Sequence, residues 1–231
     1  MTFDFVAGEV LLINKPLTWT SFDVVKKVRN TLRIKKIGHA GTLDPLASGL
    51  LILCTGKYTK SIDQIQAQEK EYTGTITIGQ TTPSYDLETP VSESKPIDHL
   101  TREDLEAAAQ KFTGTIEQIP PIYSAVWVEG RRAYDLARGG QTAEIKPRTI
   151  TIKAFEITAV EGAVISFKVV CTKGTYIRSL AHDFGQELGC GAHLSSLVRT
   201  RIGEYILEDA LTIEDIQEIR KAQLEANGSN P

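Results

Sequence analysis

Short apolar runs rich in β-branched residues recur along this 231-residue chain, and segments with helical periodicity separate them. This alternation restricts the chain to a fold that packs helices against a sheet. The runs expected to form strands are Val10–Asn14, Leu50–Cys54, Tyr72–Ile78, Ile150–Ile157 and Ala163–Cys171. The segments expected to form helices begin at Thr20 and span Thr101–Phe112, Arg131–Arg138, Arg178–Leu188 and Thr212–Glu225. The pattern therefore predicts an α+β fold built on a large mixed sheet.

Composition excludes several classes of protein. Hydrophobic residues make up 41% of the chain, which is enough for a core, and only the tail 226–231 has the composition of a disordered end. The longest apolar run, Gly49–Cys54, is far shorter than the roughly 20 residues of a membrane helix. No secretory signal is present, and the three cysteines form no C-x-x-C pair. We therefore expect a cytoplasmic protein with no membrane association, no disulfide framework and no metal site.

Charge is unevenly distributed, although the net charge of −3 by itself does not predict a nucleic-acid partner. Between Ser21 and Ala40, six basic residues accompany a single acid, which gives this window a charge of 6 − 1 = +5. A second basic group lies between Arg131 and Arg148. From charge alone, the favoured interpretation is that these basic residues lie on solvent-exposed helix faces. The alternative is that they bind a polyanion locally.

The helix that begins after Thr20 has a clear start signal and two distinct faces. Thr20 and Asp23 fit a capping pattern, and Val24, Val25, Val28 and Leu32 form an apolar stripe. Lys26, Arg29 and Arg33 are spaced so that they project from the opposite side. We expect a buried helix with a basic outer ridge.

The segment Gly38–Gly49 joins this basic region to the apolar run at Leu50. Small residues occupy nearly every second position, so the backbone can turn tightly and a ligand can approach closely. Asp44 is its central carboxylate, and Pro45 biases the backbone of Asp44 toward an extended conformation. Two interpretations remain open from these residues alone: a glycine-rich turn in which Asp44 is a cap, and a ligand site.

Six blocks of the sequence resemble the TruB family of tRNA pseudouridine synthases and follow the family's order. The run GHAGTLDPLASGLL resembles the family motif whose catalytic aspartate corresponds to Asp44. The other five blocks are INKPLTWTSFDVV, KEYTG, PPIYSAVWVEGRRAYDLARGG, GTYIRSLAHDFG and GAHLSSLVRTRIG. Together the resemblance covers most of the chain from Val10 to Gly203. Several specific blocks in one order are far stronger evidence than one short motif.

The resemblance implies an isomerase that converts the uridine at position 55 of the tRNA T-loop to pseudouridine without a cofactor. It also implies a mostly antiparallel sheet flanked by helices in one catalytic domain, residues 1–225, with an RNA-gripping insertion at about 120–148. The target nucleotide must leave the stacked loop, so base flipping is expected. The expected partner is the T-stem and T-loop of tRNA, bound by a monomer with no obligate protein partner. Because most bacterial members continue into a PUA-type RNA-binding domain, we expect a short form without one.

The resemblance also assigns roles to individual residues. Asp44 corresponds to the nucleophile, Tyr72 to the tyrosine that stacks on the flipped uracil, and Arg178 to the partner of the carboxylate. From the residues themselves, a cation at the start of the helix at Arg178 opposes the helix dipole, which favours a specific partner. The residues expected to contact substrate are His39, Leu197, Lys70, Tyr176, Arg131, Arg132, Arg138, Lys26 and Arg33.

Two residues depart from the family pattern. Thr18 stands where the family usually has glycine. Trp127 stands where many members carry lysine, and two interpretations are open: a phosphate contact is missing there, or a stacking surface replaces it. Two other functions compete with the enzyme. The first is a noncatalytic chaperone for the tRNA T-arm, but a protein that only binds RNA gains nothing from a buried carboxylate paired with a cation. The second is a glycoside hydrolase, but that reaction usually needs a second carboxylate close to the first.

Overall fold

The structure is a computed structural model that describes residues 3–124, 126–128, 130–139, 141, 144–226 and 228. The chain forms two compact units. The first contains the described residues up to Glu71 and those from Val198 onward, and the second contains those from Tyr72 to Leu197. The strands β4 (Lys70–Ile78) and β12 (Ala192–Ile202) each contribute residues to both units. No helix in the described ranges is long and apolar enough to cross a bilayer.

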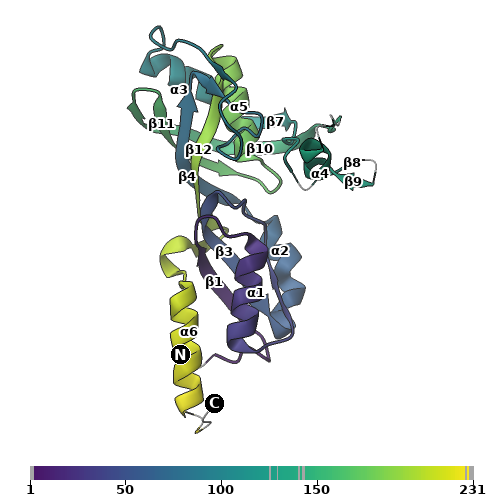
Figure 1. The fold of residues 1–231 in the computed structure, drawn as a ribbon. Helices are drawn as coiled ribbons and strands as arrows, with labels where there is room; N and C mark the ends of the chain where they lie inside the picture. The colour runs from purple at the N-terminus through teal and green to yellow at the C-terminus, as the bar shows by residue number, and fades with distance from the viewer. Residues whose placement is uncertain are drawn as a thin grey trace. The chain divides into compact units, whose positions relative to one another are not determined.

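The first unit contains three layers, with helices on both faces of its strands (Figure 1). Its strands are β1 (Val10–Lys15), β2 (Ile37–His39), β3 (Ala47–Thr55), the last part of β12 and β13 (Tyr205–Ile206). Strands β1 and β3 pair antiparallel, with Val10 opposite Cys54 and Lys15 opposite Gly49. The helical segments are α1 (Ser21–Leu32), η1 (Gly56–Ser61), α2 (Ile62–Ala67), η2 (Leu207–Asp209) and α6 (Ile213–Ala226).

Successive side chains of β1 and β3 point to opposite faces of the sheet, so apolar side chains cover both faces. Leu11, Ile13, Leu51 and Leu53 pack against the apolar stripe of α1 and against Ile213 and Ile216 of α6. Leu50, Ile52 and Cys54 point the other way and pack with Ile65 of α2 and with Ile202. Each fully buried aliphatic side chain contributes about 1.5–3 kcal/mol. Because both faces are covered, β3 is apolar along nearly its whole length.

Helix α1 begins after Thr20, as its sequence predicts. Thr20 and Asp23 form a reciprocal capping box, in which each side chain accepts a hydrogen bond from the other residue's backbone N–H. The helix ends at Arg33, which adopts the left-handed conformation (φ 55°). Val24, Val25, Val28 and Leu32 are buried, which confirms the expected core face.

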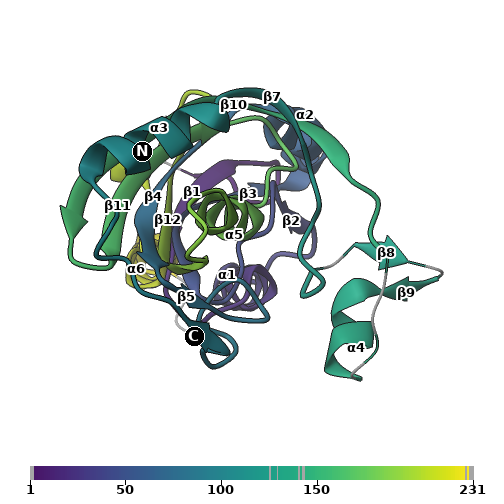
Figure 2. The same cartoon turned by 90° about the horizontal axis from the view of Figure 1, so that it is seen from above.

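The second unit is a sheet with strand order β12-β4-β11-β10-β7 (Figure 2). Its further strands are β5 (Gln80–Thr81), β6 (Glu93–Ser94), β7 (Gly114–Gln118), β8 (Trp127–Val128), β9 (Arg131–Arg132), β10 (Arg148–Glu161) and β11 (Val164–Cys171). Its helices are α3 (Arg102–Lys111), α4 (Ala133–Arg138) and α5 (Ile177–Glu187). Phe155, Phe167 and Phe184 form its aromatic core, with ring centroids 5.4–6.1 Å apart in contacting pairs. Figure 2 shows β8, β9 and α4 beside this sheet rather than on it.

The α+β fold is confirmed, and the five predicted strands are present. Three differences concern local structure. Arg131 and Arg132 belong to the hairpin strand β9, so the helix predicted from Arg131 begins at Ala133. The long strand β12 has no counterpart among the predicted strands. Ala226 is the last residue of α6 rather than part of a disordered tail, and residues 227 and 229–231 of that predicted tail lie outside the described residues.

Candidate active site

The backbone on both sides of Asp44 is fixed by hydrogen bonds from α1 and the loop before it. Asp44 lies in the turn between β2 and β3 and is half-buried. On one side, the amide of Leu43 donates to Oγ of Ser21 (2.9 Å), and this hydroxyl donates back to the carbonyl of Leu43 (3.2 Å). On the other side, the amide of Thr18 donates to the carbonyl of Pro45 (2.8 Å). These bonds hold the Asp44 backbone in place without using its carboxylate.

Arg199 braces the remainder of the same turn from β12. Its side chain is buried (1% exposed), and its guanidinium donates to three backbone carbonyls. Nε donates to Leu50 (2.8 Å), while the Nη1 and Nη2 groups donate to Thr42 (3.4 Å) and Gly41 (3.1 Å). The planar fork of arginine suits this task because it presents several donors in a rigid arrangement. One side chain therefore joins both ends of the Asp44 turn.

Lys15 places a buried ammonium group close to Asp44. The side chain is 0% exposed and donates to the carbonyls of Pro16 (2.9 Å), Trp19 (2.5 Å) and Pro45 (3.5 Å). Burial lowers the pKa of Lys15 from 10.5 to about 8, while the negative charge of Asp44 acts in the opposite direction. At pH 7 the ammonium is therefore still mostly protonated. Lys15 is therefore a positively charged group of the first unit that interacts electrostatically with Asp44.

His39 lies at the end of β2, in the same turn. It is half-buried. Burial lowers the pKa of His39, and the nearby positive charge of Arg199 lowers it further. The ring is therefore neutral at pH 7, which suits contact with an uncharged base.

In the second unit, Tyr72 and Leu197 lie on the neighbouring strands β4 and β12. Both side chains are 9% exposed. The strands approach closely at Gly74, where a Cβ atom would lie 2.2 Å from the carbonyl oxygen of Ser196, so only glycine fits. Oγ1 of Thr75 also forms hydrogen bonds of 2.8 Å with the hydroxyls of Ser195 and Ser196. The close strand pairing fixes the ring of Tyr72 and the side chain of Leu197 relative to each other.

Arg178 is the second residue of α5 and is buried (4% exposed). Its guanidinium lies 3.6 Å from Oδ2 of Asp86, which is also buried, and donates to the carbonyl of Tyr123 (2.9 Å) and that of Ser84 (3.5 Å). The guanidinium is thereby oriented from several sides. The ion pair predicted between Asp44 and Arg178 joins residues of different units, and it stays a prediction.

Exposed arginines of the insertion lie beside aromatic rings. Arg132 lies 5.7 Å from the ring centroid of Trp127, and Arg138 lies 4.2 Å from that of Tyr134. Arg138 also forms an ion pair with Glu88 (3.3 Å), and Nη1 of Arg131 donates to Gln141 (3.1 Å). Trp127 is 65% exposed, so cations and a flat ring are displayed together. Such a surface suits phosphates and unstacked bases.

Family models and curated relatives show which family this chain belongs to. The model of the TruB family pseudouridylate synthase N-terminal domain matches residues 29–177, and that of the tRNA pseudouridylate synthase B C-terminal domain matches residues 178–227. A protein of Parabacteroides distasonis named tRNA pseudouridine synthase B is 53% identical over 221 residues, which are 93% of this chain and 94% of that protein. The chain belongs to the TruB family of pseudouridine synthases.

Two solved structures contain chains that share the fold of this one. A chain in the structure titled "Crystal Structure of a Cbf5-Nop10-Gar1 Complex" is 29% identical with a TM-score of 0.74, covering 98% of this chain and 58% of that one. A chain in "Structure of H/ACA RNP bound to a substrate RNA containing 2'-deoxyuridine" is 27% identical with a TM-score of 0.71, covering 97% and 56%. This chain therefore spans less than three fifths of these two crystallised chains. Like the rest of its family, it is an isomerase.

Thr18, which replaces the usual glycine of the TruB element, keeps a glycine-like backbone. Its φ is +70°, in the left-handed region that β-branched residues rarely adopt. Its amide nevertheless donates to Pro45, so the turn needs this conformation. The threonine is therefore accommodated at the cost of local strain.

We expect Thr18→Gly to stabilise the protein by about 0.5–1 kcal/mol, because glycine removes the strain and only part of the gain is lost to backbone entropy. The midpoint of thermal unfolding should rise by about 1–4 °C for a chain of this size. As a control, Thr115→Gly in the strand β7 should lower it. An unchanged or lower midpoint for Thr18→Gly would show that Thr18 is not strained.

Other residues assigned from the TruB resemblance have visible structural partners. The ammonium of Lys70, which is buried, donates to the backbone carbonyls of Gln66 and Gln68. The backbone of Tyr176 exchanges two hydrogen bonds with the side chain of Gln118, and Arg148 lies 5.2 Å from the Tyr176 ring. Lys26 and Arg33 are exposed on α1 and at its end. Their contacts with substrate stay predictions.

Three residues that contact or support the predicted site residues were missed by sequence reasoning. Lys15 could have been found, because it shares a strand face with Leu11 and Ile13 and so breaks an apolar alternation. Arg199 and Asp86 gave no such signal, since an arginine or aspartate in a polar segment usually faces solvent. In the described ranges, no cluster of three or more His, Cys, Asp or Glu residues could hold a metal.

Proposed function

We propose that this chain isomerises the uridine at position 55 of the tRNA T-loop to pseudouridine. The main support is its 53% identity with a tRNA pseudouridine synthase B over 93% of the chain, together with a rigidly held aspartate turn. In the reaction the C1′–N1 bond breaks, the uracil turns and a C1′–C5 bond forms. C5 loses its proton and N1 gains one, so no redox cofactor is needed. We expect the protein to act as a cytoplasmic monomer without a protein partner.

Asp44 is the proposed nucleophile. Attack on the ribose and attack on the base both require an ionised carboxylate that points at the extruded nucleoside. The backbone bonds of Leu43 and Pro45 orient Asp44, and the ammonium of Lys15 and the proposed contact with Arg178 favour its charged form. Asp86 acts through Arg178 by holding its guanidinium. The Asp44 turn is thus preorganised before RNA binds.

Tyr72, His39 and Leu197 are proposed to receive the flipped base. The ring of Tyr72 offers a flat stacking surface, and neutral His39 adjoins the Asp44 turn. Leu197 excludes water, which limits hydrolysis of a detached intermediate. Base flipping requires all three surfaces to compensate for lost stacking.

The test is nucleoside analysis of unmodified tRNA after incubation with the purified chain. We expect uridine to decrease by one residue per tRNA and pseudouridine to increase by the same amount, without added cofactor. A protein that binds and refolds tRNA but leaves its nucleosides unchanged would be the chaperone alternative. A free uracil product would instead indicate hydrolysis of the glycosidic bond.

We expect replacement of Arg131, Arg132 and Arg138 together by alanine to weaken tRNA binding. Their guanidinium groups are exposed, so each phosphate contact that is lost should reduce the slope of log K against log salt by about 0.7–0.9. The measurement is a binding titration at several salt concentrations. An unchanged slope would remove these three residues from the proposed RNA surface.

A further inference from the structure

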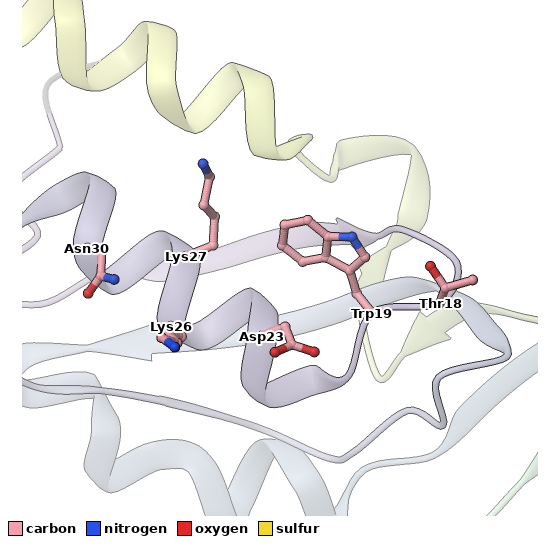
Figure 3. Close-up of a pocket in the computed structure, with 6 residues that line it drawn as sticks. All are labelled: Thr18, Trp19, Asp23, Lys26, Lys27 and Asn30. Carbon is pink, nitrogen blue, oxygen red and sulfur yellow. The ribbon is translucent and has the colours of Figure 1, made fainter.

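A cavity of about 490 Å³ that is widely open to solvent lies along α1, within the first unit (Figure 3). Asp23, Lys26, Lys27 and Asn30 line it, and their spacing places them on one side of the helix. Thr18 and Trp19 line it from the preceding loop. Its volume falls within the usual range for small-molecule sites, roughly 300–1,000 Å³.

Trp19 gives the cavity a flat wall of fixed orientation. The side chain is half-buried and packs against the core formed by α1, α6 and the strands β1 and β3. Figure 3 shows the indole ring beside Lys27, on the side of α1 that faces α6. A ring held in this way loses little entropy when a flat ligand stacks on it.

The charged groups of the cavity suit a nucleotide better than a bare anion. Lys26 and Lys27 supply two cations, whereas Asp23 supplies a carboxylate. Hydrogen bonds from the hydroxyl and amide of Thr20 lower the pKa of Asp23, so this carboxylate is ionised at neutral pH. A lone phosphate would be repelled by Asp23. A nucleotide can place its phosphate at the lysines and the N–H groups of its base toward Asp23 or Asn30.

Hydrogen bonds connect the cavity directly to the Asp44 turn. The carbonyl of Trp19 accepts a hydrogen bond from Nζ of Lys15, which also donates to Pro45. The neighbouring Thr18 donates its amide to the same carbonyl of Pro45 (2.8 Å). A ligand seated on Trp19 therefore contacts the loop that fixes the residue next to Asp44.

We propose that this cavity binds a second, unpaired nucleotide of the RNA substrate, with its base stacked on Trp19, its phosphate held by Lys27, and Lys26 adding positive charge along the same helix. The inference rests on the proposed function and extends it by naming a subsite distinct from the site of the flipped uridine. Occupation of this subsite presses on the Thr18–Trp19 loop and so stabilises the position of Asp44. Base stacking on an aromatic side chain is sequence-tolerant, so the subsite recognises an unstacked base rather than a particular one.

Trp19 itself provides the readout, because the chain has two tryptophans and Trp127→Phe leaves Trp19 as the only one. Asp44→Asn is added to prevent turnover. We expect the emission of Trp19 to fall when this variant is saturated with an unmodified T-arm RNA. An abasic substitution at one loop position should restore the emission, while substitutions at other positions should not. Binding of each RNA is followed separately by filter retention.

Charge variants provide the matched control. In the same tryptophan background, Lys26→Ala/Lys27→Ala should abolish the change in emission at RNA concentrations that saturate the parent. Lys57→Ala/Lys60→Ala, which removes the same charge from exposed residues outside the cavity, should retain it. Trp19→Leu should weaken RNA binding by about 5- to 150-fold, the range measured for single stacking contacts.

Two results would overturn the proposal. One is RNA that is retained on the filter while the emission of Trp19 stays unchanged. The other is a response to uridine or adenosine monophosphate that exceeds the response to RNA, which would indicate a site for free nucleotides. Neither result touches the proposed function, which fails only if the parent chain forms no pseudouridine. The fluorescence titration keeps Trp19 intact, so it stays informative even if Trp19→Leu is poorly folded.

Discussion

Asp44→Asn is expected to reduce the rate of pseudouridine formation by on the order of 10⁴-fold or more, with tRNA affinity changed only a few-fold. The amide has nearly the shape of the carboxylate but neither its charge nor its nucleophilicity. Hydrogen bonds to the backbone of Leu43 and Pro45 help to hold the turn, and the substitution removes neither of them. The measurement is single-turnover kinetics with saturating enzyme, alongside a binding titration.

Asp63→Asn is the matched control for Asp44. Asp63 is an exposed carboxylate in the first turn of α2, and its replacement should leave the rate within about two-fold. If Asp44→Asn retained a substantial fraction of the parent rate, the carboxylate would not be the reacting group. If it lost RNA binding in parallel with activity, Asp44 would instead be a binding residue.

Arg199→Met is expected to lower the rate of the chemical step by about 10²-fold or more, because release of the turn displaces Asp44 by a distance on the order of 1 Å. Three backbone carbonyls would lose their donor, two of them in buried hydrogen bonds, and the free energy of unfolding should fall by about 3–5 kcal/mol. Arg199→Lys keeps the charge but not the planar fork, and we expect an intermediate loss. The measurements are kcat, KM and chemical denaturation.

Arg201→Lys is the control that separates the effect of Arg199 on the Asp44 turn from a general effect of substitutions in β12. Arg201 lies on the same strand, is partly exposed and pairs with Glu69 (2.7 Å), so its replacement should cost less than about 1 kcal/mol and little activity. A positioning role predicts that Arg199→Lys lowers kcat with KM nearly unchanged. Equal losses for Arg199→Lys and Arg201→Lys, or a loss confined to stability, would contradict that role.

Much of the fold follows from local signals in the sequence. The capping box at Thr20, the apolar stripe of α1 and the continuous run of β3 each have a direct physical cause, and each was predicted. The Asp44 turn was predicted as a candidate site from its small residues and its single carboxylate. The family resemblance then supplied residue roles that composition and periodicity do not contain.

The supports of the site depend on tertiary contacts, which explains why they were missed. Strand β12 carries Ser195, Ser196, Arg199 and Arg201, and such residues have low strand propensity or usually face solvent. The burial of Arg199 follows from three carbonyls contributed by a turn about 150 residues earlier in the chain. Asp86 is likewise buried where it pairs with Arg178, a residue far along the chain. No local pattern encodes either partnership.

The most direct test maps pseudouridine at single-nucleotide resolution in unmodified tRNA treated with the parent chain and with Asp44→Asn. The account predicts one modified position, uridine 55 of the T-loop, with the parent and none with the variant. Modification at a different uridine, or an equal signal from both proteins, would contradict it.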